Sequence, residues 1–234
     1  VQGIDDREGE KVATVAAPDG QLEVSADLVI LAAGRVPNIQ GLRLEALGVR
    51  TAEGRMIVDA QMRTNVPGLY AIGDVVGEPK LAHVASAEGR VAAENALGRE
   101  TKMDYRAMPR CLYTSPDVAS VGLSEEEARA GALPVKIGRF PYAANGRAST
   151  LGRRDGFVKV VSEERYGEIL GVHIFGTRAT ELIAEAAMAM RLEATVEDLA
   201  STIHAHPTLS EATGEAAMDV FASAIHVPRA KVTA

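Results

Sequence analysis

The chain has 234 residues, of which 47% are hydrophobic and 24% charged, so it is long enough and apolar enough to build a sizeable core. Its 25 basic and 32 acidic residues leave a net charge of −7, which argues against nucleic acid as the main ligand. The single cysteine, Cys111, excludes an internal disulfide and fits a reducing compartment, and no apolar run is long enough to span a membrane.

The first segment, residues 1–36, is expected to be mainly β structure. The Pro-Asp-Gly triplet at 18–20 combines a fixed φ angle, local side-chain hydrogen bonding and tolerance of positive φ. It therefore predicts a hairpin turn between strands over 11–17 and 21–25. Residues 27–34 (DLVILAAG) form a continuous apolar run, which is typical of a strand buried on both faces.

The second segment, residues 37–100, is expected to mix helices and strands. The leucines at 42–47 predict a short helix that ends at the following glycine. Residues 68–74 (GLYAIGD) predict a buried strand that stops at a glycine and a carboxylate. A helix rich in small residues is expected over 81–97, again closed by a glycine.

The third segment, residues 101–234, is expected to be an α+β domain. Two capping boxes, Ser124/Glu127 and Thr195/Asp198, predict helix starts, because a hydroxyl and a carboxylate three residues apart satisfy the first free N–H groups. Two longer helices are expected over 181–192 and 209–222. Strands are expected over 110–114, 118–121, 135–140, 157–161 and 169–175.

The end of the 68–74 strand is the first candidate for chemistry. Gly73 would let a bulky ligand approach the backbone, and Asp74 would present a carboxylate where open α/β sheets bind ligands. A simple turn is the competing interpretation of this Gly-Asp pair. Gly34, after the apolar run at 27–34, is a second place where a nucleotide could approach the backbone, and a turn explains that glycine equally well.

Lys80, Leu81, Ala82 and His83 stand at the start of the 81–97 helix. The unpaired N–H groups and partial positive charge of a helix N-terminus would stabilise electron density on a reduced flavin. His83 by itself is interpreted as a structural histidine.

The stretch STIHAHPTLSE at 201–211 contains the strongest candidates for catalysis. If His206 faces a pocket and Glu211 bonds its far nitrogen, the pair is a base able to take a proton from a thiol. Thr208 and Glu211 also form a capping box that needs no catalysis, and one carboxylate is not expected to do both fully. A metal site at His204 and His206 is a third interpretation, although no supporting ligand cluster is evident.

Six motifs occur in an order that resembles the C-terminal half of dihydrolipoamide dehydrogenases, homodimeric FAD enzymes of the pyridine-nucleotide disulfide reductase group. The last motif is more specific for dihydrolipoamide dehydrogenases, whereas the Ile-Gly-Asp sequence at 72–74 is typical of the whole group. The motifs are GRVPN at 34–38, TNVPGLYAIGD at 64–74, LAH at 81–83, LYTSPDVASVG at 112–122, FPYAANGR at 140–147 and HAHPTLSEA at 204–212.

The resemblance implies a fold in which parts of two Rossmann-like nucleotide-binding domains precede an α+β dimerisation domain. Residues 1–36 would end the NAD-binding domain, 37–100 would return to the FAD-binding domain, and 101–234 would form the dimerisation (interface) domain.

The resemblance also implies roles for single residues. Gly73 and Asp74 would bind FAD, with Lys80, Leu81, Ala82 and His83 lining the flavin through their backbone, and Gly34 would touch NAD. His206, oriented by Glu211, would be the acid/base partner of the dithiol and would reach into the opposite subunit.

The implied function is oxidation of protein-bound dihydrolipoamide to lipoamide with NAD⁺. The partners would be a second copy of the chain and the acyltransferase component of a 2-oxo acid dehydrogenase complex, in the bacterial cytoplasm or the mitochondrial matrix. A glutathione-reductase-like enzyme and a catalytically inactive dimerisation module are the alternatives.

Two features of the resembled enzymes are missing from this sequence: their glycine-rich nucleotide-binding turns and their Cys-x-x-x-x-Cys redox pair. The chain also begins at Val1 rather than at a methionine, which suggests processing or a piece of a longer protein. We therefore expect a C-terminal fragment that is inactive alone.

Overall fold

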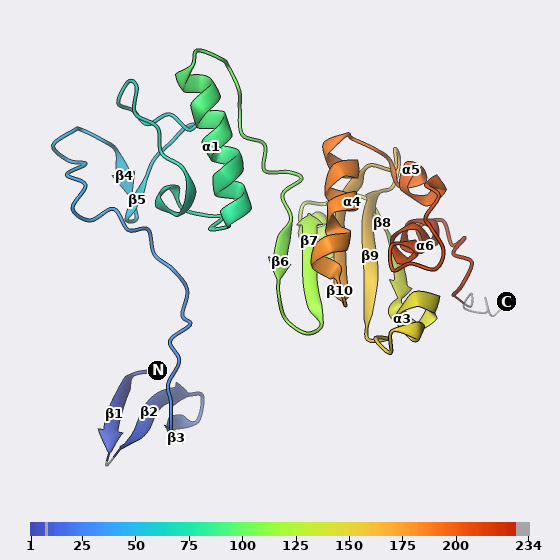
Figure 1. Ribbon diagram of the computed structural model, residues 1–234, viewed down its shortest axis with the longest axis horizontal. Coiled ribbons are helices and arrows are strands. Elements are labelled where there is room, and N and C mark those ends of the chain that lie inside the picture. The colour runs from blue at the N-terminus through green and yellow to red at the C-terminus, as the bar shows by residue number, and fades with distance from the viewer. Residues whose placement is uncertain (8, 228–234) are drawn as a thin grey trace. The chain divides into compact units, whose positions relative to one another are not determined.

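The computed structural model describes residues 1–7 and 9–227 and divides into two compact units, Val1–Thr101 and Lys102–Ala234 (Figure 1). They are called the N-terminal unit and the C-terminal unit below. No helix in the described ranges is both long and apolar enough to cross a membrane. The elements of the N-terminal unit are β1 (Gly3–Arg7), β2 (Glu10–Ala17), β3 (Gly20–Ala26), β4 (Thr51–Ala52), β5 (Arg55–Met56), the 3₁₀ turn η1 (Gly73–Val76) and α1 (Ala82–Ala96).

The hairpin predicted at 18–20 is confirmed. Strands β1, β2 and β3 form an antiparallel sheet in that order, and the register of β2 and β3 runs to Ala17 opposite Gly20. Pro18 and Asp19 are therefore a two-residue loop, in which proline supplies the fixed φ angle at the first position. Gly20 has a φ of +128°, which explains the glycine at the end of the loop.

The prediction of a buried strand over 27–34 is wrong. The structure forms no strand there, and Leu28, Ile30 and Leu31 are 72%, 80% and 86% exposed. A strand buried on both faces needs strands beside it and helices above and below it. Among the described residues no strand pairs with this run, so its apolar side chains have no covering elements in this chain.

Two further predictions in the N-terminal unit need correction. The leucine-bearing stretch at 42–47 forms a series of turns rather than a helix, closed by Gly48 with a φ of +68°. The expected strand at 68–74 is reduced to one bridge, between Tyr70 and Arg63, before η1 begins. A small core around Val49, Met56 and Ala71 holds this region together. As with 27–34, short apolar runs become strands only where neighbouring strands pair with them.

The helix expected over 81–97 is confirmed as α1. Leu81 is its extended N-cap residue, and Gly98, with a φ of +85°, follows its last turn. Val84, Val91 and Ala92 are buried along one side of the helix, which accounts for the small apolar residues in its sequence.

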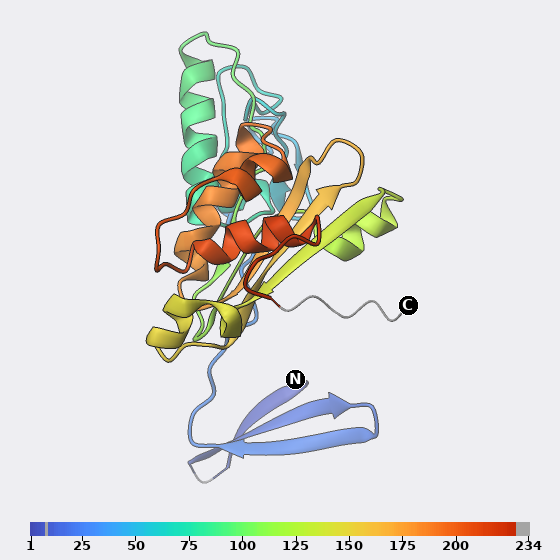
Figure 2. The same cartoon turned by 90° about the vertical axis from the view of Figure 1, so that its right-hand side faces the viewer.

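The C-terminal unit is a five-stranded antiparallel sheet in the order β6-β7-β10-β9-β8, which confirms all five strands predicted there (Figure 2). Helix α4 packs on β7 and β10, helix α6 packs on β8 and β9, and α5 packs on α6. The elements are β6 (Arg110–Leu112), β7 (Asp117–Gly122), α2 (Glu125–Ala130), β8 (Val135–Pro141), η2 (Tyr142–Ala144), α3 (Gly146–Thr150), β9 (Gly156–Glu163), β10 (Ile169–Gly176), α4 (Ala179–Arg191), α5 (Val196–Ser201) and α6 (Glu211–Asp219).

The core of this unit lies between the sheet and its helices. Val158, Val160, Val172 and Ile174 alternate along β9 and β10 and are fully or almost fully buried there, in contact with apolar residues such as Ile183 of α4. Such period-two alternation is typical of strands that turn one face toward a core. Both predicted capping boxes are present, at Ser124/Glu127 before α2 and at Thr195/Asp198 before α5.

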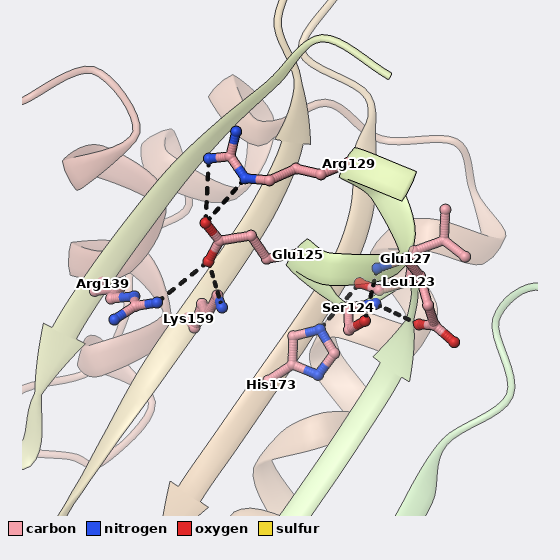
Figure 3. A network of polar contacts seen from close by, with 8 residues as sticks. All are labelled: Leu123, Ser124, Glu125, Glu127, Arg129, Arg139, Lys159 and His173. Carbon is pink, nitrogen blue, oxygen red and sulfur yellow. Dashed lines mark hydrogen bonds and ion pairs between the residues drawn. The ribbon is translucent and has the colours of Figure 1, made fainter. Parts of the chain in front are cut away.

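Glu125, at the start of α2, joins this helix to the sheet face that the core does not use (Figure 3). Its carboxylate lies 2.6 Å from Lys159 Nζ, 3.1 Å from an Arg129 guanidinium nitrogen and 3.2 Å from one of Arg139. Lys159 first, and then Arg129 and Arg139, outweigh partial burial and lower the pKa of Glu125 to about 2. The carboxylate is therefore ionised over the whole physiological range.

This lowered pKa predicts how Glu125 contributes to stability as the pH changes. A carboxyl group whose pKa is lower in the folded than in the unfolded chain stabilises the fold above the unfolded pKa, and the stabilisation is lost as pH falls through the folded value. Denaturant unfolding of the wild type and of Glu125→Gln should differ most near neutral pH, with the wild type more stable. The difference should shrink between about pH 4.5 and pH 2; a difference independent of pH would contradict the ion-pair account.

Candidate functional site

Residues 202–210 connect α5 to α6 and are called the 202–210 loop. The loop contains both histidines of the HAHPT motif, and its His206–Pro207 peptide bond is cis. Helix α6 begins at Glu211, two residues later than the start expected from the sequence, with Ser210 as its N-cap residue. Loop and helix together carry the predicted catalytic residues of this unit.

His206 and Glu211 are brought together as the dyad interpretation predicts. The imidazole Nδ1 lies 2.9 Å from Glu211 Oε1, and the His206 side chain is 78% exposed. Because Nδ1 is bonded to the carboxylate, the Nε2 atom of the same ring is the one left for proton exchange with a substrate. The arrangement is that of a general base oriented by a carboxylate.

Glu211 also forms one half of the predicted Thr208/Glu211 capping box, but Ser210 is the N-cap residue of α6 and no side chain caps the helix. The Oε2 atom of Glu211 accepts a hydrogen bond of 2.8 Å from the Thr208 backbone N–H, while Oε1 bonds His206. Burial raises the pKa of Glu211, but the Thr208 N–H and the His206 ring together outweigh it and hold the pKa below the usual value for glutamate. The Thr208 hydroxyl donates instead to the Ala205 carbonyl, 2.7 Å away.

The metal interpretation of His204 and His206 finds no support in the geometry. His204 Nε2 lies 2.7 Å from Glu185 Oε1 of α4, whereas His206 bonds Glu211. Each histidine therefore has its own carboxylate. No group of three or more His, Cys, Asp or Glu residues able to hold a metal exists within residues 1–7 and 9–227.

A third histidine–carboxylate pair lies one helical turn after Glu211. Glu215 is almost fully buried, and its Oε1 lies 2.6 Å from His226 Nδ1. Its Oε2 accepts hydrogen bonds from the backbone N–H groups of Ile225 and His226 at 2.9 and 3.2 Å. Glu215 thus ties the segment that follows α6 back onto that helix. The two residues of this pair are 11 positions apart, and no motif of the sequence predicts their contact.

The N-terminal unit brings together part of the predicted cofactor set. An Arg35 guanidinium nitrogen lies 3.2 Å from Asp74 Oδ2, and Lys80 Nζ donates to the Arg35 carbonyl at 2.8 Å. Arg35 also donates to the Lys80 carbonyl. Arg35, for which the sequence predicts no role, thus links the chain beside Gly34 to the turn containing Asp74.

The glycines and the helix start fit one end of a nucleotide cofactor. Gly34 and Gly73 have φ angles of +94° and +72°, and nothing lies within 4 Å of a Cβ built at Gly34. At Gly73 such a Cβ would lie 3.2 Å from Ala85 Cβ, so packing on α1 also requires this glycine, and buried Glu88 accepts its N–H at 2.7 Å.

Leu81 is half-buried, and Ala82 and His83 are exposed on the first turn of α1. That turn contains no acidic residue that would compete with an anionic group. Together with the partly exposed Asp74 carboxylate, which accepts hydrogen bonds, these residues suit the ribityl or pyrophosphate portion of a flavin nucleotide.

Two models of known protein families match the chain. Residues 108–217 match the model of the pyridine nucleotide-disulphide oxidoreductase dimerisation domain, and residues 1–89 match the model of the pyridine nucleotide-disulphide oxidoreductases. The chain belongs to the pyridine nucleotide-disulphide oxidoreductase family, whose members use FAD and NAD(P).

Among curated relatives, the chain is similar to several dihydrolipoyl dehydrogenases. It is 48% identical to that of Thermus scotoductus, over 94% of this chain and 48% of that protein. It is 42% identical to the mitochondrial enzyme of Pisum sativum, over 97% of this chain and 46% of that protein. The chain spans about half the length of these relatives.

Solved structures of flavoprotein disulfide reductases have the same fold. LpdA from Mycobacterium tuberculosis matches with a TM-score of 0.85 and 32% identity, over 92% of this chain and 47% of that one. The HOCl-induced flavoprotein disulfide reductase RclA from Escherichia coli matches with a TM-score of 0.80 and 25% identity, over 92% of this chain and 49% of that one.

Proposed function

We propose that this chain is the C-terminal half of a dihydrolipoyl dehydrogenase that oxidises protein-bound dihydrolipoamide to lipoamide with NAD⁺. The observation that carries the proposal is the His206–Glu211 pair, with Nδ1 held at 2.9 Å and the rest of the ring exposed. Identities of 41–48% to dihydrolipoyl dehydrogenases, over more than nine tenths of the chain, favour this substrate over glutathione-type disulfides.

The proposed role of His206 is to move the thiol proton. With its Nδ1–H donated to Glu211, the ring keeps its lone pair on Nε2 and accepts the proton of a dihydrolipoamide thiol there. The resulting thiolate attacks a disulfide, which a neutral thiol does poorly. The carboxylate of Glu211 stabilises the imidazolium that forms, and its lowered pKa keeps it charged for that purpose.

The proposed cofactor contacts lie in the N-terminal unit. FAD, when bound, supplies the two-electron acceptor between the dithiol and NAD⁺. Asp74 and Gly73 would hold its ribityl or pyrophosphate portion, residues 80–83 would line the flavin through Lys80, Leu81, Ala82 and His83, and Gly34 would touch NAD. The family's use of FAD and NAD(P) and the open backbone at Gly34 support these assignments.

The proposed domain organisation has three parts and a two-fold axis. Residues 1–36 end the NAD-binding domain, 37–100 return to the FAD-binding domain, and 101–234 form the interface domain of a homodimer, in which His206 serves the partner's site. The match of 108–217 to a dimerisation domain supports this. So do the exposed apolar side chains of the C-terminal unit, which include Leu112, Tyr113, Met188, Leu192, Ile203 and Ile225.

The partner proposed for the whole enzyme is the acyltransferase component of a 2-oxo acid dehydrogenase complex, which carries the dihydrolipoamide. The net charge of −7 suits a basic docking domain. We place the enzyme in the cytoplasm, in keeping with its single cysteine and with its similarity to enzymes of Thermus scotoductus and Bacillus subtilis.

The test is a substrate profile of the complete enzyme, in which this chain is joined to the half that it lacks. Dihydrolipoamide with NAD⁺ should be turned over far faster than glutathione disulfide with NADPH. The 234-residue chain, mixed with FAD, should show no NADH oxidation and weak flavin retention, because it holds one cysteine and no redox pair. Preference of the complete enzyme for glutathione disulfide and NADPH would overturn the proposal.

A further inference from the structure

His204 has no role in the function proposed above, yet it is the more deeply enclosed of the two histidines in the 202–210 loop. Its side chain is 10% exposed, and its Nε2 atom lies 2.7 Å from Glu185 Oε1. Glu185 belongs to α4, 19 residues earlier in the chain. A hydrogen bond to an ionised partner is among the stronger ones, so this contact anchors the loop to α4.

The other side of the His204 ring lies against α6. A Cβ built on Gly214 would be 2.9 Å from His204 Nδ1 and 3.0 Å from Cε1, closer than a real Cβ is found. Gly214 is in the middle of the helix, where glycine is less favourable than alanine. The absence of a side chain at 214 therefore leaves room for the imidazole, which fills the space between α4 and α6.

His204 belongs to the loop that contains His206, and its ring lies against α6, the helix that contains Glu211. His206 is two residues along the loop, and Glu211 is on α6 three residues before Gly214. The remainder of the loop is held by Thr208, whose N–H bonds Glu211 and whose carbonyl accepts from the buried Asn145 amide at 3.0 Å. His204 fixes the loop before the dyad, and Asn145 fixes it after.

We propose that His204, anchored by Glu185, is a positioning residue that sets the distance and angle between the His206 ring and the Glu211 carboxylate. The inference rests on the proposed function, because His204 affects the reaction only by holding His206, the proposed base, in place. His204 does not touch the substrate in this proposal. The His204 ring contacts both α4 and α6, so it holds the loop at a defined position relative to α6. That position matters because a displacement of about 1 Å at a catalytic group can lower the rate roughly 100-fold.

The experiment uses the complete enzyme with two separate substitutions, His204→Ala and Glu185→Ala. His204→Ala should lower kcat for dihydrolipoamide oxidation about 10- to 100-fold with little change in KM. Glu185→Ala keeps the His204 ring and removes its anchor, so it should also lower kcat, by a smaller factor. This variant tests the proposal if His204→Ala fails to fold. His204→Gln, which can extend an amide N–H toward Glu185, should recover part of the activity.

Two readouts separate positioning from general damage to the structure. Oxidation of NADH by an artificial electron acceptor needs no thiol proton transfer and should stay at the wild-type rate. In His204→Ala, kcat for dihydrolipoamide should fall while KM stays near the wild-type value, because the change displaces the base that is held by Glu211 and leaves the substrate contacts in place.

The matched control is His173→Gln. His173 is a partly enclosed histidine of the same unit whose Nε2–H donates to the Leu123 carbonyl at 3.0 Å, on the α2 side of the sheet (Figure 3). This variant should leave both kcat and KM unchanged.

Combining His204→Ala with His206→Gln separates the two proposals. If His204 acts through His206, the double variant should be no slower than His206→Gln alone. Wild-type kcat in folded, flavin-loaded His204→Ala and Glu185→Ala, beside a strongly impaired His206→Gln, would overturn the inference and leave the proposed function standing. Equal losses of dihydrolipoamide and artificial-acceptor activity would also overturn it. Full activity of His206→Gln would instead contradict the proposed function.

Discussion

Replacing His206 with glutamine in the complete enzyme should lower kcat for dihydrolipoamide oxidation by about 10²–10⁴-fold, the usual contribution of a positioned general base. Glutamine occupies a similar volume and can still donate to Glu211, but it cannot accept a proton at neutral pH. The fold should be unaffected, because the His206 side chain is 78% exposed. The measurement is steady-state turnover of dihydrolipoamide with NAD⁺.

The loss in His206→Gln should be specific to the thiol half of the reaction. NADH oxidation by an artificial acceptor should continue, and the melting temperature should remain that of the wild type. His173→Gln is the matched control, because His173 belongs to the same unit, bonds the Leu123 carbonyl and has no role in the proposed site; it should retain dihydrolipoamide turnover. Near-normal lipoamide-dependent turnover in His206→Gln would remove His206 from the catalytic role.

Replacing Gly138 with alanine should strongly destabilise the C-terminal unit. Gly138 lies in β8 where α6 crosses it, and a Cβ there would collide with the Ala216 carbonyl oxygen and lie 2.7 Å from the Val220 backbone nitrogen. The obstacle is backbone rather than a flexible side chain, so the helix itself must move. Overpacking of this kind costs about 3 kcal/mol, which corresponds to a fall in Tm of roughly 6–12 °C for a chain of this size.

The Gly138→Ala effect should reach the candidate site, because α6 also carries Glu211. Thermal unfolding of the 234-residue chain measures the stability, and the dihydrolipoamide assay of the complete enzyme measures the consequence for the dyad. Gly146→Ala makes the same chemical change in α3, where nothing lies within 4 Å of the added Cβ, and should leave the Tm unchanged or slightly higher. Equal melting temperatures for Gly138→Ala and the wild type would contradict the close packing of α6 on β8.

Most of the C-terminal unit could be predicted from the sequence because its signals are local. The capping boxes at Ser124 and Thr195 need partners only three residues away. In β9, Val158 and Val160 are two residues apart and both belong to the core. In the N-terminal unit the same methods failed at 27–34, where the apolar run has no neighbouring strand among the described residues. A buried strand is a property of its neighbours as much as of its own residues.

In the candidate site, too, contacts between residues close in the sequence could be predicted and contacts between distant residues could not. His206 and Glu211 are five residues apart, and their pairing could be expected from the motif, although not that one carboxylate would serve both the ring and the Thr208 N–H. Asn145 lies within a motif quoted for the family resemblance, but its bond to Thr208 spans 63 residues and could not be expected from that motif. Nothing in the sequence distinguished Glu185 from the other charged residues of its amphipathic helix, so its bond to His204 could not be predicted.

The sequence by itself determined which segments of the C-terminal unit become strands and helices, and it identified the family and the histidine proposed as the base. The helices, the strands and the His206–Glu211 pair depend on residues within a few positions of one another, where backbone geometry dictates which side chains meet. The family was indicated instead by six motifs that follow one another in order between residues 34 and 212. Only the tertiary structure decided that His204 bonds Glu185, that Asn145 holds Thr208 and that Arg35 bonds Asp74. Those partners are brought together by the packing of whole elements, and no spacing along the chain encodes which distant side chains will meet.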